Sequence, residues 1–245
     1  MQVFAMTQKG TLSKENEDRI IIGKTILSNG FFRCDNHSGV VAVADGVGGN
    51  NAGAIASHYV AYRLGDMLST SKEFLESVNK ELLALSESNS DYHKMATTLS
   101  GFTYIDSCIS SFHVGNSRIY AILGGRYLKQ LTEDDTALTY LLKSGKLSPE
   151  EVDTYQDNNE ITACFGGGDS NLLDLAITDN CDARTLLLVT DGVHNFVSID
   201  ELEGIIQNEE HYFPICRSIV NKAEQNGSSD DISVVIINID EFMEG

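Results

Sequence analysis

The sequence has few of the features that divide a chain into domains. Its 245 residues include only two prolines, and no Ser-, Gly- or Pro-rich tract separates one half from the other. Hydrophobic residues make up 42% of the chain, which is enough to build a packed core. We therefore expect a single domain over residues 1–245.

Positive charge is also scarce. The chain has 17 Lys and Arg residues against 36 Asp and Glu residues, which gives a formal net charge of −19 at pH 7. Such a charge repels the phosphates of DNA and RNA, so no nucleic-acid partner is expected. Most of these acidic side chains are expected on a solvated surface, and a minority could bind divalent cations, which prefer hard oxygen ligands.

Cysteines and long apolar runs are rare. The five cysteines form no CxxC pair and no Cys/His cluster with zinc-site spacing, which favours reduced thiols. No apolar run approaches the roughly 20 residues that a bilayer span needs, and the first nine residues lack the pattern of a signal peptide. We therefore expect a cytoplasmic protein that has no membrane partner.

Short apolar runs predict a fold rich in strands. They lie at residues 40–44, 99–105, 108–114, 118–123, 186–189 and 232–239. The second and third runs are expected to form a hairpin about Asp106-Ser107. Several runs follow one another with no helix between them, which favours antiparallel pairing over repeated βαβ units.

Helical patterns interrupt these strands. Apolar residues at helical spacing predict helices over residues 52–68 and from about 70 to 85. A further helix over about 214–225 is expected to end at Asn226-Gly227. Sequences typical of helix starts stand at Thr70–Glu73, Ser148–Glu151 and Ser198–Glu201.

Two apolar strands run directly into an Asp-Gly pair. Residues 42–44 lead into Asp45-Gly46, and residues 188–190 lead into Asp191-Gly192. Each carboxylate is expected where a buried strand emerges, and the glycine lets the backbone turn and expose a carbonyl beside it. Taken alone, Asp-Gly is a routine turn dipeptide, and a plain turn is the more frequent interpretation of either pair.

Two further acidic clusters adjoin predicted strands. Glu17 and Asp18 precede the run at 20–22, and Asp230 precedes the run at 232–235. If the four strands are sheet neighbours, their carboxylates converge at one edge. Buried carboxylates repel one another unless cations neutralise them. Carboxylates, a glycine carbonyl and water are the ligands that Mg²⁺ and Mn²⁺ prefer, so the pattern indicates a metal site.

Five motifs follow one another along the chain. They are Asn16-Glu17-Asp18, Asp45-Gly46-Val47-Gly48-Gly49, Gly115-Asn116-Ser117-Arg118, Asp191-Gly192 and Ser229-Asp230-Asp231-Ile232-Ser233. Their order resembles that of the metal-dependent protein phosphatases, the type 2C serine/threonine phosphatases, in their bacterial form. The resemblance covers nearly the whole chain, and it is the ordered set that makes it specific.

This resemblance implies an α+β fold in which two packed antiparallel β-sheets are flanked by α-helices. It implies one type 2C phosphatase domain over residues 1–245, with a flap-like insertion at about 136–160. It also implies a binuclear centre that holds two Mg²⁺ or Mn²⁺ ions at one end of the sheets. Six residues are expected to form this centre: Asp45 between the ions, Asp191 and Asp230 on one ion, Glu17 and the Gly46 carbonyl on the other, and Asp18 in support.

The chemistry that the resemblance implies is hydrolysis of phosphoserine and phosphothreonine in proteins. A metal-bridged water would attack phosphorus with no phosphoenzyme, and Asp45 and Asp191 would act through that water. The expected partners are phosphorylated proteins, made by a serine/threonine kinase in a signalling role.

Three positions depart from the family's pattern. Ser13 stands where the family usually has an arginine that grips the substrate phosphate. The neighbouring Lys14 could replace that arginine as a point charge, or it could be an ordinary surface lysine. Asn116 and Asn195 stand where two aspartates help to bind an additional metal ion in many members. We expect this third site to be lost or very weak.

These departures leave two functions open. The first is an active phosphatase with weak phosphate binding and slow turnover, because a charge-assisted hydrogen bond to the phosphate is missing. The alternative is a catalytically impaired phosphatase-like module that binds phosphoproteins or regulates a partner. Retention of the predicted metal ligands favours the enzyme, whereas Ser13, Asn116 and Asn195 favour the alternative.

Overall fold

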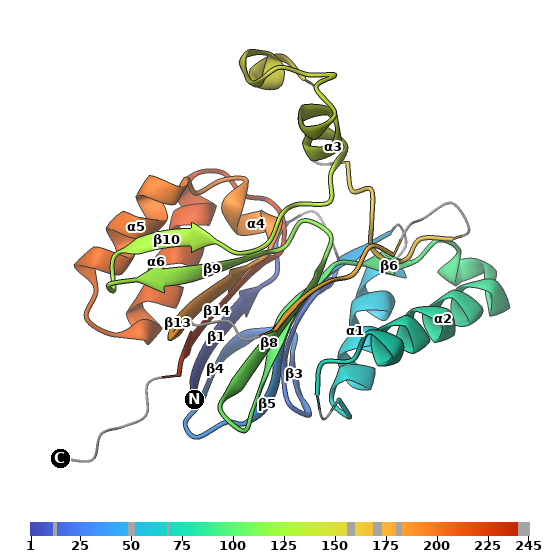
Figure 1. Cartoon of the computed structure of the whole chain (residues 1–245), viewed down its shortest axis with the longest axis horizontal. Coiled ribbons are helices and arrows are strands. Elements are labelled where there is room, and N and C mark those ends of the chain that lie inside the picture. The colour runs from blue at the N-terminus through green and yellow to red at the C-terminus, as the bar shows by residue number, and fades with distance from the viewer. Residues whose placement is uncertain are drawn as a thin grey trace.

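The computed structural model describes residues 1–11, 14–48, 52–67, 69–155, 160–168, 173–179 and 183–239. In this part of the chain, two antiparallel β-sheets pack face to face, and helices lie on both sides of the pair (Figure 1). The predicted α+β class, with two packed sheets between helices, is confirmed.

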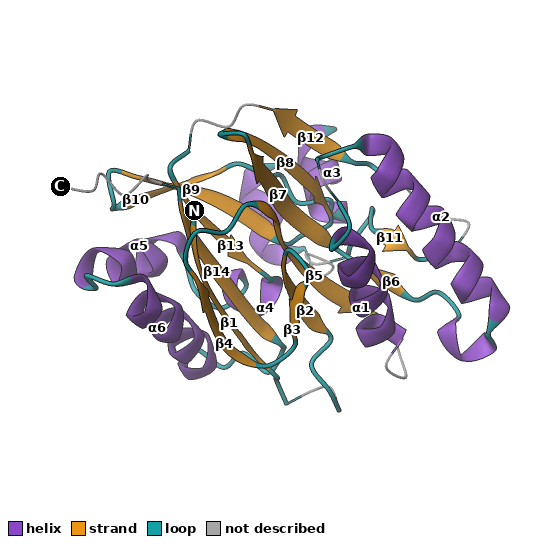
Figure 2. Cartoon of the chain, turned by 90° about the horizontal axis from the view of Figure 1, so that it is seen from below, coloured by secondary structure: helices purple, strands orange, loops and turns teal. Residues whose placement is uncertain are grey.

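The first sheet has six strands in the order β10-β9-β13-β14-β1-β4. Its strands are β1 (Gln2–Gln8), β4 (Gly30–Cys34), β9 (Arg118–Leu123), β10 (Tyr127–Gln130), β13 (Thr185–Val189) and β14 (Ile232–Asn238). Helices on its outer face are α4 (Asp191–His194), α5 (Ile199–Asn208) and α6 (Tyr212–Gln225). Figure 2 shows α5 and α6 lying against this sheet.

The second sheet has eight strands. The order β11-β6-β5-β7-β8-β12 forms its path, and β2 pairs with β5 on one side and with β3 on the other. The strands are β2 (Asp18–Ile22), β3 (Thr25–Leu27), β5 (Gly39–Val47), β6 (Ala96–Thr97), β7 (Leu99–Ile105), β8 (Cys108–Val114), β11 (Phe165–Gly166) and β12 (Ala176–Asp179). Helices α1 (Ala52–Leu64) and α2 (Lys72–Ser88) cover its outer face, and η1 (Ser90–Tyr92) follows α2.

The long apolar runs of the sequence are explained by burial on both faces. On β14, Val235 lies in the core between the sheets, whereas Val234 and Ile236 face the helices. On β5, Val43 lies between the sheets and Ala42 packs toward α1 and α2. Strands that are covered on both sides need no polar alternation, so they appear as continuous apolar segments.

The predicted hairpin at residues 99–114 is confirmed. Its register pairs Leu99 with Val114 and Ile105 with Cys108. Asp106 and Ser107 both have positive φ, at 50° and 63°. Two left-handed residues in a two-residue loop match the right-handed twist of the strands that they join.

The predicted helix starts are largely confirmed. Ser148 and Ser198 both form capping boxes, although Ser148 leads into a 3₁₀ helix, η2 (Pro149–Thr154). The start of α2 was predicted one residue too early. Ser71 is the N-cap and accepts from the Phe74 backbone N–H, while the Thr70 hydroxyl is taken by Thr103. A tertiary contact thus decides which of two adjacent hydroxyls caps the helix.

The segment that contains α3 (Ala137–Lys143) and η2 extends away from the sheets (Figure 1). Its two ends meet at an isolated bridge between Thr136 and Ile161 and at a 2.9 Å hydrogen bond from the Ala137 N–H to the Glu160 carbonyl. The flap-like insertion at 136–160 in a single 1–245 domain remains a prediction. None of the helices in the described part of the chain combines the length and the apolar character of a membrane span.

Candidate metal centre

The predicted ligands come from both sheets. Asp18 opens β2 and pairs in register with Asp45 on β5 in the second sheet. Asp191 follows β13 and Asp230 precedes β14, which are neighbours in the first sheet. The expectation of convergence along one sheet edge is therefore wrong, because each sheet contributes one pair. The pairs meet across the interface, where the Thr190 hydroxyl donates to Asp18 Oδ2 at 2.8 Å.

The two Asp-Gly pairs are not plain turns. At Asp45 the strand does not stop, because β5 continues through Gly46 to Val47. At Asp191 the chain enters the short helix α4. In both places the glycine allows close packing: a Cβ on Gly46 would lie 2.2 Å from the Gly53 carbonyl oxygen, and one on Gly192 would lie 2.0 Å from the Asp231 carbonyl oxygen. The turn interpretation of these pairs is wrong.

These carboxylates are close enough to repel one another electrostatically. Burial, followed by repulsion from Asp191, Asp18 and Asp230, raises the pKa of Asp45 well above its usual range. Burial raises the pKa of Asp18 to about 8, against the hydrogen bonds from Ser233 and Thr190. Burial and the charge of Asp191 raise the pKa of Asp230 to about 6. The shared direction identifies a cluster of carboxylates in which burial and mutual repulsion disfavour the charged forms.

Glu17 reaches the same region from the start of β2. Its pKa is raised by burial and then by the charge of Asp231, while an N–H of Ala54 in the first turn of α1 donates to its carboxylate. The Gly46 N–H donates to the Glu17 carbonyl at 3.2 Å. A Cβ on Gly53 would lie 2.9 Å from Glu17 Oε2. The Glu17 loop thus lies directly against Gly46 and the first turn of α1, and the binding of one ion by Glu17 and the Gly46 carbonyl remains a prediction.

Asn116 and Asn195 lie against Asp191. The Asn116 amide nitrogen donates to Asp191 Oδ2 at 3.1 Å, and that of Asn195 donates to the same oxygen at 3.5 Å. Asn116 is 2% exposed, and its Oδ1 has no hydrogen-bond partner among the residues that the structure describes. Asn116 and Asn195 therefore place neutral amides beside this carboxylate.

The side chains do not form a closed cage. Among the residues that the structure describes, no three His, Cys, Asp or Glu side chains are already arranged to hold one ion. Repulsion between like charges at short range opposes such an arrangement unless cations are present. The ligand assignments therefore rest on the cluster and on the family.

Comparison with known proteins places the chain in a family. The family model for protein phosphatase 2C matches residues 28–235. Serine/threonine phosphatase stp of Listeria monocytogenes is 30% identical over 252 aligned residues, which cover 98% of this chain and 96% of that protein. This chain belongs to the protein phosphatase 2C family. The resemblance drawn from the five motifs and the prediction of a serine/threonine phosphatase are confirmed.

Solved structures share the protein phosphatase 2C fold. The crystal structure of the Mycobacterium tuberculosis serine/threonine phosphatase PstP/Ppp matches with a TM-score of 0.82 and 24% identity, over 98% of this chain and 100% of that one. A catalytic domain of PstP in complex with two manganese ions matches with a TM-score of 0.73 and 24% identity, over 97% and 99%. At this level of identity the likeness establishes the fold.

The predicted phosphate-binding position of this phosphatase lies partly outside the described residues. Ser13 belongs to the part of the chain that is not described, and Lys14 is exposed. The choice between a phosphate-binding and an ordinary surface role for Lys14 therefore stays open as predicted.

Sequence reasoning missed Asp231 as a functional residue. Its carboxylate accepts from the Glu17 N–H at 2.6 Å and from the Gly10 N–H at 2.8 Å. It thus ties the Glu17 loop to the start of β14. The only signal was the doubled Asp230-Asp231, in which neighbouring residues of an extended chain point to opposite sides.

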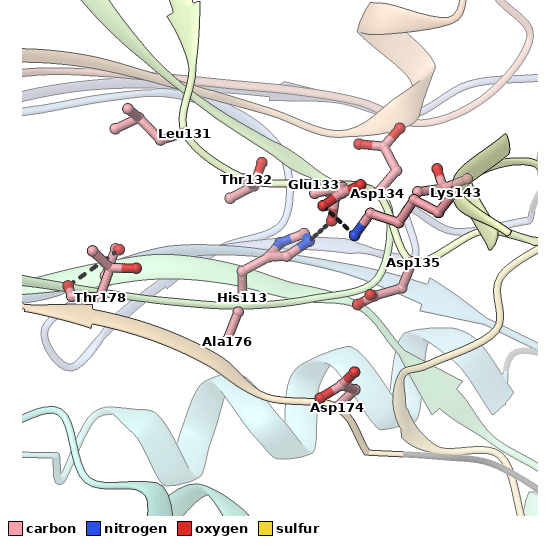
Figure 3. A pocket seen from close by; sticks show the side chains of 12 residues that line it. His113, Leu131, Thr132, Glu133, Asp134, Asp135, Lys143, Asp174, Ala176 and Thr178 are labelled. Atoms are coloured by element: carbon pink, nitrogen blue, oxygen red, sulfur yellow. Dashed lines mark hydrogen bonds and ion pairs between the residues drawn. The ribbon is translucent and has the colours of Figure 1, made fainter. Parts of the chain in front are cut away.

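An acidic cavity of about 300 Å³ is lined in part by Thr139 and Lys143 of α3. Its wall carries Glu133, Asp134, Asp135, Asp174 and Lys143 (Figure 3). None of the predicted metal ligands lines it. It connects to the Gly115-Asn116 loop because the Gly115 N–H donates to Asp135 Oδ2 at 2.8 Å.

Asp135 should make stability depend on pH. Burial, with the charges of Asp174 and Asp134, raises its pKa to about 6, against the hydrogen bond from Gly115. Between pH of about 4 and 6 the folded state holds a proton that the unfolded state releases, so stability falls as pH rises. We expect urea midpoints measured in EDTA to fall less steeply across this window in Asp135→Asn than in the wild type. Parallel curves would contradict the shift.

Proposed function

We propose that this phosphatase hydrolyses phosphoserine and phosphothreonine in proteins, with two Mg²⁺ or Mn²⁺ ions held between its sheets. The observation that carries the proposal is the cluster of Asp18, Asp45, Asp191 and Asp230, in which burial and neighbouring carboxylates raise the pKa values of Asp18, Asp45 and Asp230. A fold that keeps these charges together needs cations to neutralise them.

The residues present fit such ions. All candidate donors are oxygens, which suit Mg²⁺ and Mn²⁺. Asp18 Oδ1 is buried and has no hydrogen-bond partner among the described residues. A bound cation in this cluster would explain the unpaired acceptor. We assign Asp45 to both ions, Asp191 and Asp230 to one, and Glu17 with the Gly46 carbonyl to the other. The related PstP catalytic domain in complex with two manganese ions supports this number.

When bound, divalent cations lower the pKa of water and offset the charge of phosphoryl oxygens. The chain's own residues orient the ligands. Thr98 Oγ1 accepts from the Asp45 N–H at 3.1 Å, and Thr190 holds Asp18. The amides of Asn116 and Asn195 hold Asp191 Oδ2. The bonds from Thr190 and the two amides hold the carboxylates of Asp18 and Asp191, and the bond to Thr98 holds the backbone of Asp45.

The substrates we propose are phosphorylated proteins, which a serine/threonine kinase would supply. Membership of the protein phosphatase 2C family and the relatives named serine/threonine phosphatase support this class. A cytoplasmic location remains a prediction.

A catalytically impaired module is the second candidate. Neutral amides stand beside Asp191 where many relatives carry further carboxylates, and this favours it. An assay of para-nitrophenyl phosphate and a phosphothreonine peptide with Mn²⁺ separates the two. We expect turnover well above that of a double variant, Asp45→Ala with Asp191→Ala. Wild-type activity no higher than that of the double variant would overturn the proposal that the protein is an active phosphatase.

Ser13→Arg should strengthen substrate binding. A guanidinium adds a charge-assisted hydrogen bond to phosphate worth ~1.5–3 kcal/mol, which corresponds to about ten- to a hundredfold in KM. Steady-state kinetics on the phosphothreonine peptide measure this, with Ser13→Gln as a control of similar bulk that lacks the charge. An unchanged KM and kcat in Ser13→Arg would count against this placement.

A further inference from the structure

A buried arginine stands directly behind the Glu17 loop. Arg19 lies on β2 and is only 7% exposed. Its Nη1 donates to the carbonyls of Asn16 and, at 2.7 Å, Asp18, and its Nη2 donates to the Ala54 carbonyl at 3.5 Å. The first two carbonyls flank Glu17 on either side along the chain. One guanidinium therefore joins the backbone around Glu17 to the first turn of α1.

The alternation of β2 places Arg19 on the side away from the carboxylate cluster. Ile20 and Ile22 pack in the core between the sheets, as does the Asp18 side chain, which reaches Thr190 of the other sheet. Ile21 packs toward α1 and α2. Successive strand residues face opposite sides, so Arg19 shares the α1 side with Ile21. It therefore contacts the backbone of the Glu17 loop from the α1 side.

Other bonds hold the same loop against α1. The Ser57 hydroxyl donates to the Glu17 carbonyl at 2.5 Å, and Ser57 is fully buried. The Ala54 N–H donates to the Glu17 carboxylate. Arg19 and Ser57 thus fix the backbone of Glu17, while α1 itself meets its carboxylate.

Stability alone gives no reason for a buried arginine here. Arginine is almost never fully buried, and burying its charge carries a desolvation cost. Arg19 Nε has no hydrogen-bond partner in the structure, which adds to that cost. An apolar residue beside Ile21 would pack without these penalties. Of the three bonds that offset the cost, two go to the segment that carries Glu17 and the third goes to α1, against which that segment packs.

We propose that Arg19 is a positioning residue for the ion held by Glu17. Its fork of donors sets the Glu17 backbone against α1, so that the carboxylate is in place before the ion arrives. This inference rests on the proposed two-metal centre. It implies that Arg19 affects one ion more than the other, because Asp191 and Asp230 belong to the opposite sheet.

Calorimetric titration of Mn²⁺ into the metal-free, full-length protein tests this without any assay of activity. Replacing a residue that orients a metal ligand typically weakens binding by about 10- to 100-fold. We expect a loss of this size for one ion in Arg19→Met, with the other ion within about twofold of the wild type. Arg19→Lys should fall between, because lysine keeps the charge but loses the planar fork.

Arg33→Met is the matched control. Arg33 lies on β4, stands over the ring of Phe4 on β1 and forms an ion pair with the exposed Asp35. Within the described part of the chain it makes no hydrogen bond to the Glu17 loop. It should bind both ions as the wild type does. If Arg19→Met lowered the affinity for both ions equally, or for neither, the proposal would be overturned. A residue that only stabilises the fold would not lower the affinity for one ion more than for the other.

Ser57→Ala provides a second measurement should Arg19→Met not fold. It removes the hydroxyl that holds the Glu17 carbonyl, so the same ion should weaken. Unchanged binding of both ions in Ser57→Ala and Arg19→Lys would also overturn the proposal. A wild type that binds two ions but has no activity would overturn the proposed function alone. A wild type that binds none would overturn both.

Discussion

Asp45→Asn should abolish phosphatase activity and at the same time make the metal-free protein more stable. Asp45 is the carboxylate that we assign to both ions, and its pKa is raised by burial and by Asp191, Asp18 and Asp230. An amide keeps the size of the side chain but removes the charge that both ions need. We expect kcat with Mn²⁺ to fall by about a thousandfold or more, since both ions stabilise the charge of the transition state.

The stability change has the opposite sign. Without metal, the buried charge of Asp45 repels its neighbours, so its removal relieves the folded state. A gain of ~1 kcal/mol would raise the melting temperature by about 2 to 4 °C in a chain of this length. Thermal melts in EDTA measure this gain, and melts with Mn²⁺ should show that the variant has lost most of the stabilisation that the ion gives to the wild type.

Asp200→Asn is the control for this pair of effects. Asp200 is exposed in the first turn of α5, so its loss should leave both activity and the response to Mn²⁺ close to the wild type. An Asp45→Asn variant that keeps activity within tenfold, or that melts lower than the wild type in EDTA, would place Asp45 outside the metal centre.

Asn116→Asp combined with Asn195→Asp should create a third ion site. In the wild type, both amides donate to Asp191 Oδ2, and neither brings a charge. The two substitutions would replace these amide donors with anionic carboxylate oxygens next to Asp191 Oδ2. Taking ~1.5–3 kcal/mol for each charged interaction, affinity for a third ion should rise by at least about a hundredfold. Titration with Mn²⁺ should then count three ions instead of two.

The double variant also has a signature without metal. Its new carboxylates face Asp191 with no donor between them, so it should melt lower than the wild type in EDTA and gain more from Mn²⁺. Asn208→Asp, at the exposed end of α5, makes the same substitution away from the centre. It should change neither the number of bound Mn²⁺ ions nor the rise in melting temperature that Mn²⁺ causes. Three ions of comparable affinity in the wild type would rule out the lost third site.

The parts of the fold that follow from local pattern were predictable. The hairpin at 99–114 and the strand at 118–123 have the predicted bounds, because their apolar runs and turn residues act over a few positions. The two-residue strands β6 and β11 are too short to carry any periodicity. The edge strand β4 is largely exposed on one side and has no strong apolar signal. Such strands exist because a neighbour in the sheet pairs with them.

The candidate site divides in the same way. Glu17, Asp45 and Asp191 could be found because each stands beside an apolar run within an ordered set of motifs. Asp231 and Arg19 could not be found, because the contacts that they make are tertiary and leave no pattern in the sequence. Asp231 bonds to a backbone N–H 214 positions away. The placement of the carboxylates in two sheets also depends on strand order, which no local pattern specifies.

The division of the ligands between two sheets has a consequence for assembly. In the proposed assignment Asp191 and Asp230 adjoin strands of one sheet and Asp45 lies in the other, so the ion that these three would hold binds tightly only when the two β layers have already docked. The affinity for this ion then depends on both layers, and any partly folded form with the layers apart would release it. When bound, the ion would link the two layers, and chelation should loosen them first at this end.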